Sequence, residues 1–139
     1  MKAEYICTAC GLQFPASDGP PDSCAICIDY RQFVPRAGQQ WTTLGTLRRN
    51  HRNAFQQLEP GLIGVATTPE FAIGQRALLV RTAAGNVLWD CISLIDDATI
   101  EIIRALGGVR AIAHRHLTSA LLHDAGGVEP RLRGSCVHS

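Results

Sequence analysis

The sequence has 139 residues, a size typical of one domain with a hydrophobic core. Apolar residues make up 46% of it and charged residues 18%, which excludes a disordered or fibrous chain. Thirteen basic and twelve acidic residues leave a net charge of +1, which does not favour an electrostatically driven nucleic-acid binder. No apolar run approaches the roughly 20 residues of a membrane span, and residues 1–5 contain no apolar signal core. We therefore expect a cytoplasmic protein without membrane association.

The strongest pattern lies near the N-terminus, where two C-x-x-C pairs are separated by thirteen residues. The pairs are Cys7 with Cys10 and Cys24 with Cys27. A gap of two residues lets the backbone turn and direct both sulfurs at one ion, and two such turns complete a tetrahedral four-thiolate site. The pattern predicts one structural zinc ion bound by these four cysteines.

Three alternatives to zinc stay open at this point. Iron can occupy a four-thiolate site, the cysteines can stay unligated, or they can pair as disulfides, although a reducing cytosol disfavours disulfides. Four sulfur ligands leave no open position on the metal, so the site indicates a role in folding or contact rather than catalysis. A segment this short needs such a metal to fold, and we delimit a zinc-ribbon-like segment at residues 1–37.

The middle of the chain alternates between helical and extended patterns. A helix is expected to start near Trp41 with Thr42 or Thr43 as its cap, and to continue through an apolar face that includes Phe55 until residues 59–61 break it. Apolar runs then predict strands, and a cap at Asp96 or Asp97 predicts a helix to residue 106. The expected strands are residues 62–66, 77–82, 87–91 and 109–113. These elements predict a mixed α/β (α+β) fold, in which both faces of the sheet are covered.

These segments resemble the opening of the metallo-β-lactamase (MBL) fold. Residues 71–82 and 85–91 are similar to the first hairpin of such hydrolases, in which Asp90 matches an aspartate near the metals. The helix and the strand at 109–113 match the next elements, which in the family lead into an H-x-H motif. Some bacterial members also have a zinc-ribbon-like segment followed by a Trp-Thr-Thr stretch, as at residues 41–43. The resemblance covers residues 5–113 and implies that residues 38–113 form the N-terminal half of the fold.

The resemblance ends after residue 113. His114 and His116 have the H-x-H spacing, but Leu117 follows where the family has Asp-His, and later ligand motifs are missing. Neither histidine is therefore assigned as a metal ligand, no catalytic residue is assigned, and no catalytic zinc is expected. Three protein ligands are the minimum for a catalytic zinc site.

Residues 114–139 form an atypical tail that contains four of the five histidines. When the codons that could encode residues 114–132 are read one base later, they can encode a peptide with a His-Pro-His motif like that of the family. We therefore expect that residues 114–139 are translated in a shifted reading frame. The nucleotide sequence tests this, because a single frame correction near codon 114 must open a long downstream frame.

The sequence thus predicts a truncated MBL-fold metal-dependent hydrolase-like protein without activity of its own. The parent family hydrolyses small-molecule substrates with zinc. The alternative is a zinc-ribbon binding module that contacts a protein or a nucleic acid. Loss of half the fold would also uncover one sheet face and promote self-association. Some of the side chains expected on that face are among Leu78, Val80, Leu88 and Ile112.

Overall fold

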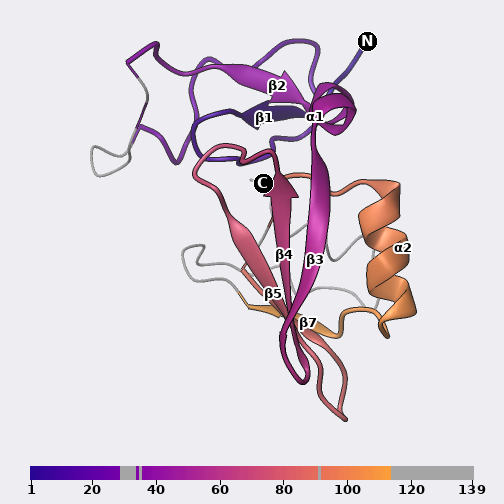
Figure 1. The fold of residues 1–139 in the computed structure, drawn as a ribbon. Helices are drawn as coiled ribbons and strands as arrows, with labels where there is room; N and C mark the ends of the chain where they lie inside the picture. Colours follow the sequence, from indigo (N-terminus) through magenta and orange to yellow (C-terminus); the bar gives the residue numbers. More distant parts are fainter. Residues whose placement is uncertain (29–33, 35, 91, 114–139) are drawn as a thin grey trace.

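A computed structural model describes residues 1–28, 34, 36–90 and 92–113 of the chain. Within these residues the fold mixes two helices with a two-stranded and a five-stranded sheet (Figure 1), which confirms the α+β class. None of the described helices is long and apolar enough to cross a membrane. The predictions for His114, His116 and the reading frame of 114–139 concern residues outside the described part.

The small sheet connects the first cysteine pair to a segment beyond the second pair. Strand β1 (Tyr5–Cys7) runs antiparallel to β2 (Trp41–Thr43), with Cys7 opposite Trp41. The Trp41 ring meets the Phe14 ring edge to face, with centroids 5.2 Å apart. We call the described part of residues 1–43 the cysteine module, because this pairing joins its two ends.

Helix α1 (Leu44–Asn50) begins as predicted but is shorter than expected. Thr43 is the N-cap, and its Oγ1 accepts a hydrogen bond from the Thr46 N–H at 3.2 Å. The helix ends at His51, whose backbone is extended, and strand β3 (Arg52–Glu59) follows. Phe55 therefore lies on a strand, and the predicted helix over these residues was wrong. Side chains at 52–56 alternate between exposed and half-buried, which is the period of a strand.

The large sheet has the order β3-β4-β5-β6-β7. Neighbouring strands are antiparallel except β6 and β7, which are parallel and are joined through helix α2. The four predicted strands after residue 61 are all present, with ends shifted by one or two residues. Their bounds are β4 (Leu62–Thr68), β5 (Arg76–Val80), β6 (Val87–Trp89) and β7 (Ala111–Ala113).

Helix α2 (Asp97–Ala105) covers one face of this sheet (Figure 1). Asp96, one of the two residues predicted as its cap, is the N-cap and accepts hydrogen bonds from both the N–H and the hydroxyl of Thr99. The helix stops before Gly107 and Gly108, which both have positive φ.

Replacing Asp96 with alanine is expected to lower the free energy of unfolding by about 1 kcal/mol, because the Thr99 N–H loses its acceptor. Urea denaturation of the full chain measures the change. Asp18→Ala, at an exposed position in the cysteine module, is the matched control. Equal stabilities of the two variants would contradict this role for Asp96.

The main core fills the space between α2 and the sheet. Leu79 and Leu88 from the strands pack there with Ile100 and Ile103 from the helix. Of the residues considered for the uncovered face, Leu88 lies on the covered face, because only 1% of its surface is exposed. Ile112 lies beside Leu88 in register and packs against the same core, so it is also on the covered face.

The opposite face of the sheet is less covered. Leu78 and Val80 are half-buried and alternate with the core residues of β5, as expected. Leu78 lies opposite Trp89, whose surface is 47% exposed, and Val80 lies opposite Val87. Self-association through this face stays a prediction.

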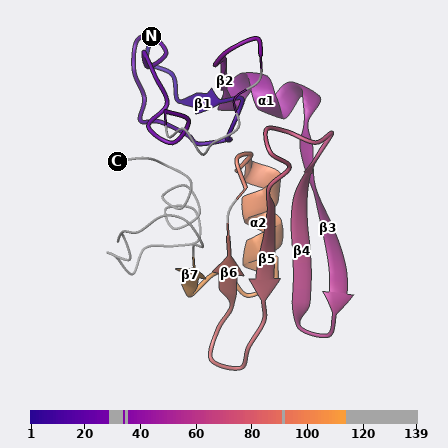
Figure 2. The ribbon, with the colours of Figure 1, turned by 90° about the vertical axis from the view of Figure 1, so that its left-hand side faces the viewer.

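The cysteine module sits at the end of the large sheet that carries the β4–β5 loop, as Figure 2 shows. Ile6 from β1, Leu47 from α1 and Leu94 from the segment before α2 form a buried cluster at this junction. Leu44 and Phe71 pack at its border. The module is therefore attached to the rest of the fold by an apolar contact of its own.

Candidate metal centre

The first cysteine pair lies in a tight turn after β1, which we call the first knuckle (residues 7–11). The Gly11 N–H donates to the Cys7 carbonyl at 2.8 Å, and the Cys7 N–H donates to the Leu12 carbonyl at 2.9 Å. Gly11 has φ +79°, a conformation that residues with a Cβ rarely adopt. This turn leaves both sulfurs of the pair on the same side, as the two-residue gap predicts.

The second cysteine pair lies in a separate turn, the second knuckle (residues 24–28). Here the Ile28 N–H donates to the Cys24 carbonyl at 3.1 Å. Cys7, Cys10 and Cys24 are buried, whereas Cys27 is half-buried. The cysteines and their apolar neighbours form a small core of their own, to which Leu12 and Phe14 belong.

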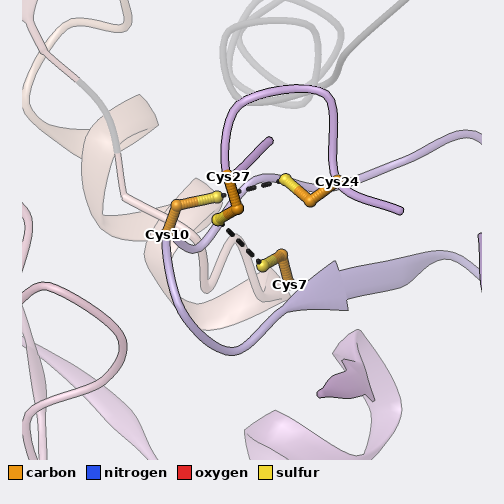
Figure 3. Close-up of side chains that lie close together, drawn as sticks. All are labelled: Cys7, Cys10, Cys24 and Cys27. Carbon is orange, nitrogen blue, oxygen red and sulfur yellow. Dashed lines mark hydrogen bonds between the residues drawn. The ribbon is translucent and has the colours of Figure 1, made fainter. Parts of the chain in front are cut away.

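The four sulfurs converge on one point (Figure 3). All four lie within 4.8 Å of one another, and none is in a disulfide. The Cys7 and Cys27 sulfurs are 3.7 Å apart, and those of Cys10 and Cys24 are 3.6 Å apart. A tetrahedron with Zn–S bonds of about 2.3 Å has sulfur–sulfur edges of about 3.8 Å. The two knuckles therefore present their sulfurs at the spacing of a four-thiolate metal site.

The close approach and burial of the thiols shift their pKa values in opposite directions. A hydrogen bond with the Cys10 thiol lowers the pKa of Cys7 to about 4, and the same hydrogen bond raises the pKa of Cys10. Burial raises the pKa of Cys27 to about 12. A divalent cation that displaces the thiol protons suits such a donor set, because thiolates are the metal-binding form of cysteine.

The described part of the chain contains no other group of three or more His, Cys, Asp or Glu side chains arranged to hold a metal. Asp90, which the sequence singled out, follows β6 with φ +68°. Its backbone N–H donates to the Ala113 carbonyl at 2.7 Å, so Asp90 lies next to the end of β7.

Two polar side chains that the sequence did not indicate hold the first knuckle against the large sheet. Gln75 Nε2, from the β4–β5 loop, donates to the Cys10 carbonyl at 3.0 Å. The buried hydroxyl of Ser93 donates to the Gly11 carbonyl at 2.7 Å. Both side chains also line a pocket of about 220 Å³ beside the β4–β5 loop. The cysteine module thus has polar as well as apolar contacts with the rest of the fold.

A third residue that the sequence did not indicate is Gln39, which contacts both knuckles. Its side chain hydrogen-bonds the Cys24 N–H and the Cys7 sulfur. No spacing rule predicts this residue, because Gln39 is 32 positions from Cys7 and outside any motif.

Comparison with known proteins found similarity to a curated chain described as an uncharacterized protein YmaE from Bacillus subtilis (strain 168). The two are 46% identical over 114 residues, which is 81% of this chain and 42% of the relative. This chain therefore spans less than half the length of that protein. No family model matches the sequence, and no solved structure shows significant similarity to it.

Proposed function

We propose that this chain binds one zinc ion through Cys7, Cys10, Cys24 and Cys27, and that the ion stabilises the cysteine module. The observation that carries the proposal is the sulfur spacing of 3.6–3.7 Å across the two knuckles. Four thiolates fill the coordination sphere of zinc, so the bound ion supplies folding energy rather than a reactive position. The cysteines hold it, and their surroundings keep water away because three of the four are buried.

Cobalt substitution tests the donor set. The reduced full chain, titrated with Co²⁺, is expected to develop the intense visible absorption and the sulfur-to-metal charge-transfer bands of tetrahedral thiolate cobalt. Addition of zinc should bleach both. A spectrum of weak octahedral bands would contradict a four-thiolate site.

We also propose that the module belongs to the N-terminal part of an MBL-like metallo-hydrolase. The order of elements supports this, since two antiparallel hairpins are followed by a helix and a parallel strand. The position of Asp90 next to the end of β7 supports it too, because the resemblance assigns metal ligands to these two strand ends. The activity in question would be zinc-assisted hydrolysis of a small molecule, in which the metal lowers the pKa of bound water.

This chain by itself is expected to show no hydrolase activity. Among the described residues, no second group of side chains is arranged to bind a metal, and the sequence after His116 departs from the motif of the family. Zinc-loaded full chain, assayed with a generic ester and a β-lactam, should give the rate of buffer with free zinc. Turnover that a chelator and His116→Ala both abolish would contradict this prediction.

The alternative function is a binding module for a protein or a nucleic acid. One observation favours it: Arg48, Arg49 and Arg52 are all exposed at the end of α1 and the start of β3, next to the cysteine module. A salt titration of binding to generic DNA and RNA separates the two functions. Binding that weakens steeply with salt supports the module, since released counterions drive such contacts.

A further inference from the structure

We propose that Gln39 is a positioning residue that sets how tightly the four-cysteine site retains its metal. The inference rests on the proposed zinc site and concerns the affinity of that site for its metal. Gln39 is not one of the four proposed ligands, but its side chain hydrogen-bonds both knuckles. The Cys24 N–H lies 3.0 Å from its Oε1, and the Cys7 Sγ lies 3.5 Å from its Nε2.

The first of these hydrogen bonds fixes the direction of the second. A backbone N–H can only donate, so the Cys24 N–H selects the amide oxygen of Gln39. The amide nitrogen, which can only donate, must then point towards Cys7, and its nearest acceptor there is the sulfur. The amide plane therefore bridges one residue of each pair with no alternative orientation.

The backbone around Gln39 is itself held in place. The Gln40 carbonyl accepts hydrogen bonds from the N–H and the hydroxyl of Thr8, at 3.0 and 3.1 Å. Trp41, the next residue, pairs with Cys7 across the small sheet. Gly38 has φ +82°, which permits the bend that directs the following side chain at the knuckles. The segment thus supports Gln39 from both sides.

An N–H···S contact matters most when the sulfur carries charge. Four thiolates around a divalent ion leave a net charge of −2, and a donor to one sulfur disperses part of it. Loss of a hydrogen-bond partner of a metal ligand commonly costs about 10- to 100-fold in metal affinity. We therefore expect Gln39 to slow metal loss by stabilising the Cys7 thiolate and by keeping the two knuckles in register.

Two substitutions separate these contributions. Gln39→Ala removes both hydrogen bonds. Gln39→Glu keeps an oxygen acceptor for the Cys24 N–H but replaces the donor to Cys7 with a negatively charged oxygen. Gln40→Ala is the matched control, because the Gln40 side chain is exposed and only its carbonyl contacts Thr8.

The experiment uses the zinc-loaded full chain of each variant in competition with a chromophoric chelator. We expect Gln39→Ala to lower zinc affinity by about 10-fold and Gln39→Glu by more, with Gln40→Ala equal to the parent chain. In the cobalt forms, loss of the donor should shift the sulfur-to-metal charge-transfer band to lower energy, since the sulfur lone pairs are no longer stabilised. A purely structural role would not move this band.

The proposal is overturned if Gln39→Ala and Gln40→Ala retain zinc equally, or if the charge-transfer band of Gln39→Glu matches that of the parent. Failure of the parent chain to bind stoichiometric zinc is a different result, which contradicts the proposed metal site itself. Circular dichroism of each metal-loaded variant confirms that the compared proteins are folded.

Discussion

Replacing Cys24 with serine is expected to abolish stoichiometric zinc binding and to unfold the cysteine module. Cys24 is fully buried and lies 3.6 Å from the Cys10 sulfur, so a hydroxyl there removes one of four ligands where nothing can substitute. Structural zinc sites contribute about 10–16 kcal/mol of apparent binding free energy, and small modules are commonly unfolded without the ion. The core between α2 and the large sheet consists of other residues and should persist.

Zinc content after gel filtration and limited proteolysis measure these two effects. The variant should lose its zinc and become sensitive to proteases before residue 44, while the sheet resists. Cys136→Ser is the matched control, because Cys136 stands outside both C-x-x-C pairs. A Cys24→Ser chain that keeps one zinc ion and its protease resistance would refute the four-cysteine site.

Replacing Gly11 with alanine is expected to be the most disruptive change at the junction between module and sheet. A left-handed backbone costs a residue with a Cβ about 1–2 kcal/mol. The new Cβ would also overlap the Ser93 hydroxyl and lie 2.9 Å from Gln75 Oε1. Forcing such neighbours apart adds a cost of about 1–3 kcal/mol. We therefore expect a total destabilisation of about 3 kcal/mol and faster zinc loss.

Gly19→Ala provides the control for Gly11→Ala. A Cβ at Gly19 meets no atom within 4 Å, and its φ is not in the left-handed region. Its free energy of unfolding should stay within about 0.5 kcal/mol of the parent. Urea denaturation followed by tryptophan fluorescence compares the two variants, and similar midpoints for both would show that the knuckle does not pack against Ser93.

Local patterns explain why much of the fold could be predicted from sequence. Asp96 caps α2 and glycines end it, and both signals act within a few residues of the helix. The prediction for residues 52–59 was wrong because Phe55 fits the spacing of a helix face as well as that of a strand. Their conformation is decided by pairing with β4, a contact that no local pattern displays.

The residues of the candidate site were also predictable only in part. The spacing within each C-x-x-C pair is a local requirement of metal geometry, so the cysteines are recognisable from the sequence alone. Gln39, Gln75 and Ser93 act from 32, 65 and 82 residues away from their partners in the first knuckle. Only the folded chain brings them there. The placement of Leu88 on the covered face follows from strand register, which sequence alone leaves undetermined by one residue.

The metal content of the chain purified under reducing conditions tests the central claim most directly. Elemental analysis against protein concentration, with native mass spectrometry to assign the ion to the intact chain, gives the stoichiometry. We predict about one zinc ion per chain, lost together with the module's protection when any of Cys7, Cys10, Cys24 or Cys27 is replaced. A chain without bound metal and with four freely alkylated thiols would contradict the four-cysteine zinc site. Two or more ions per chain would contradict the prediction that this chain binds no catalytic zinc.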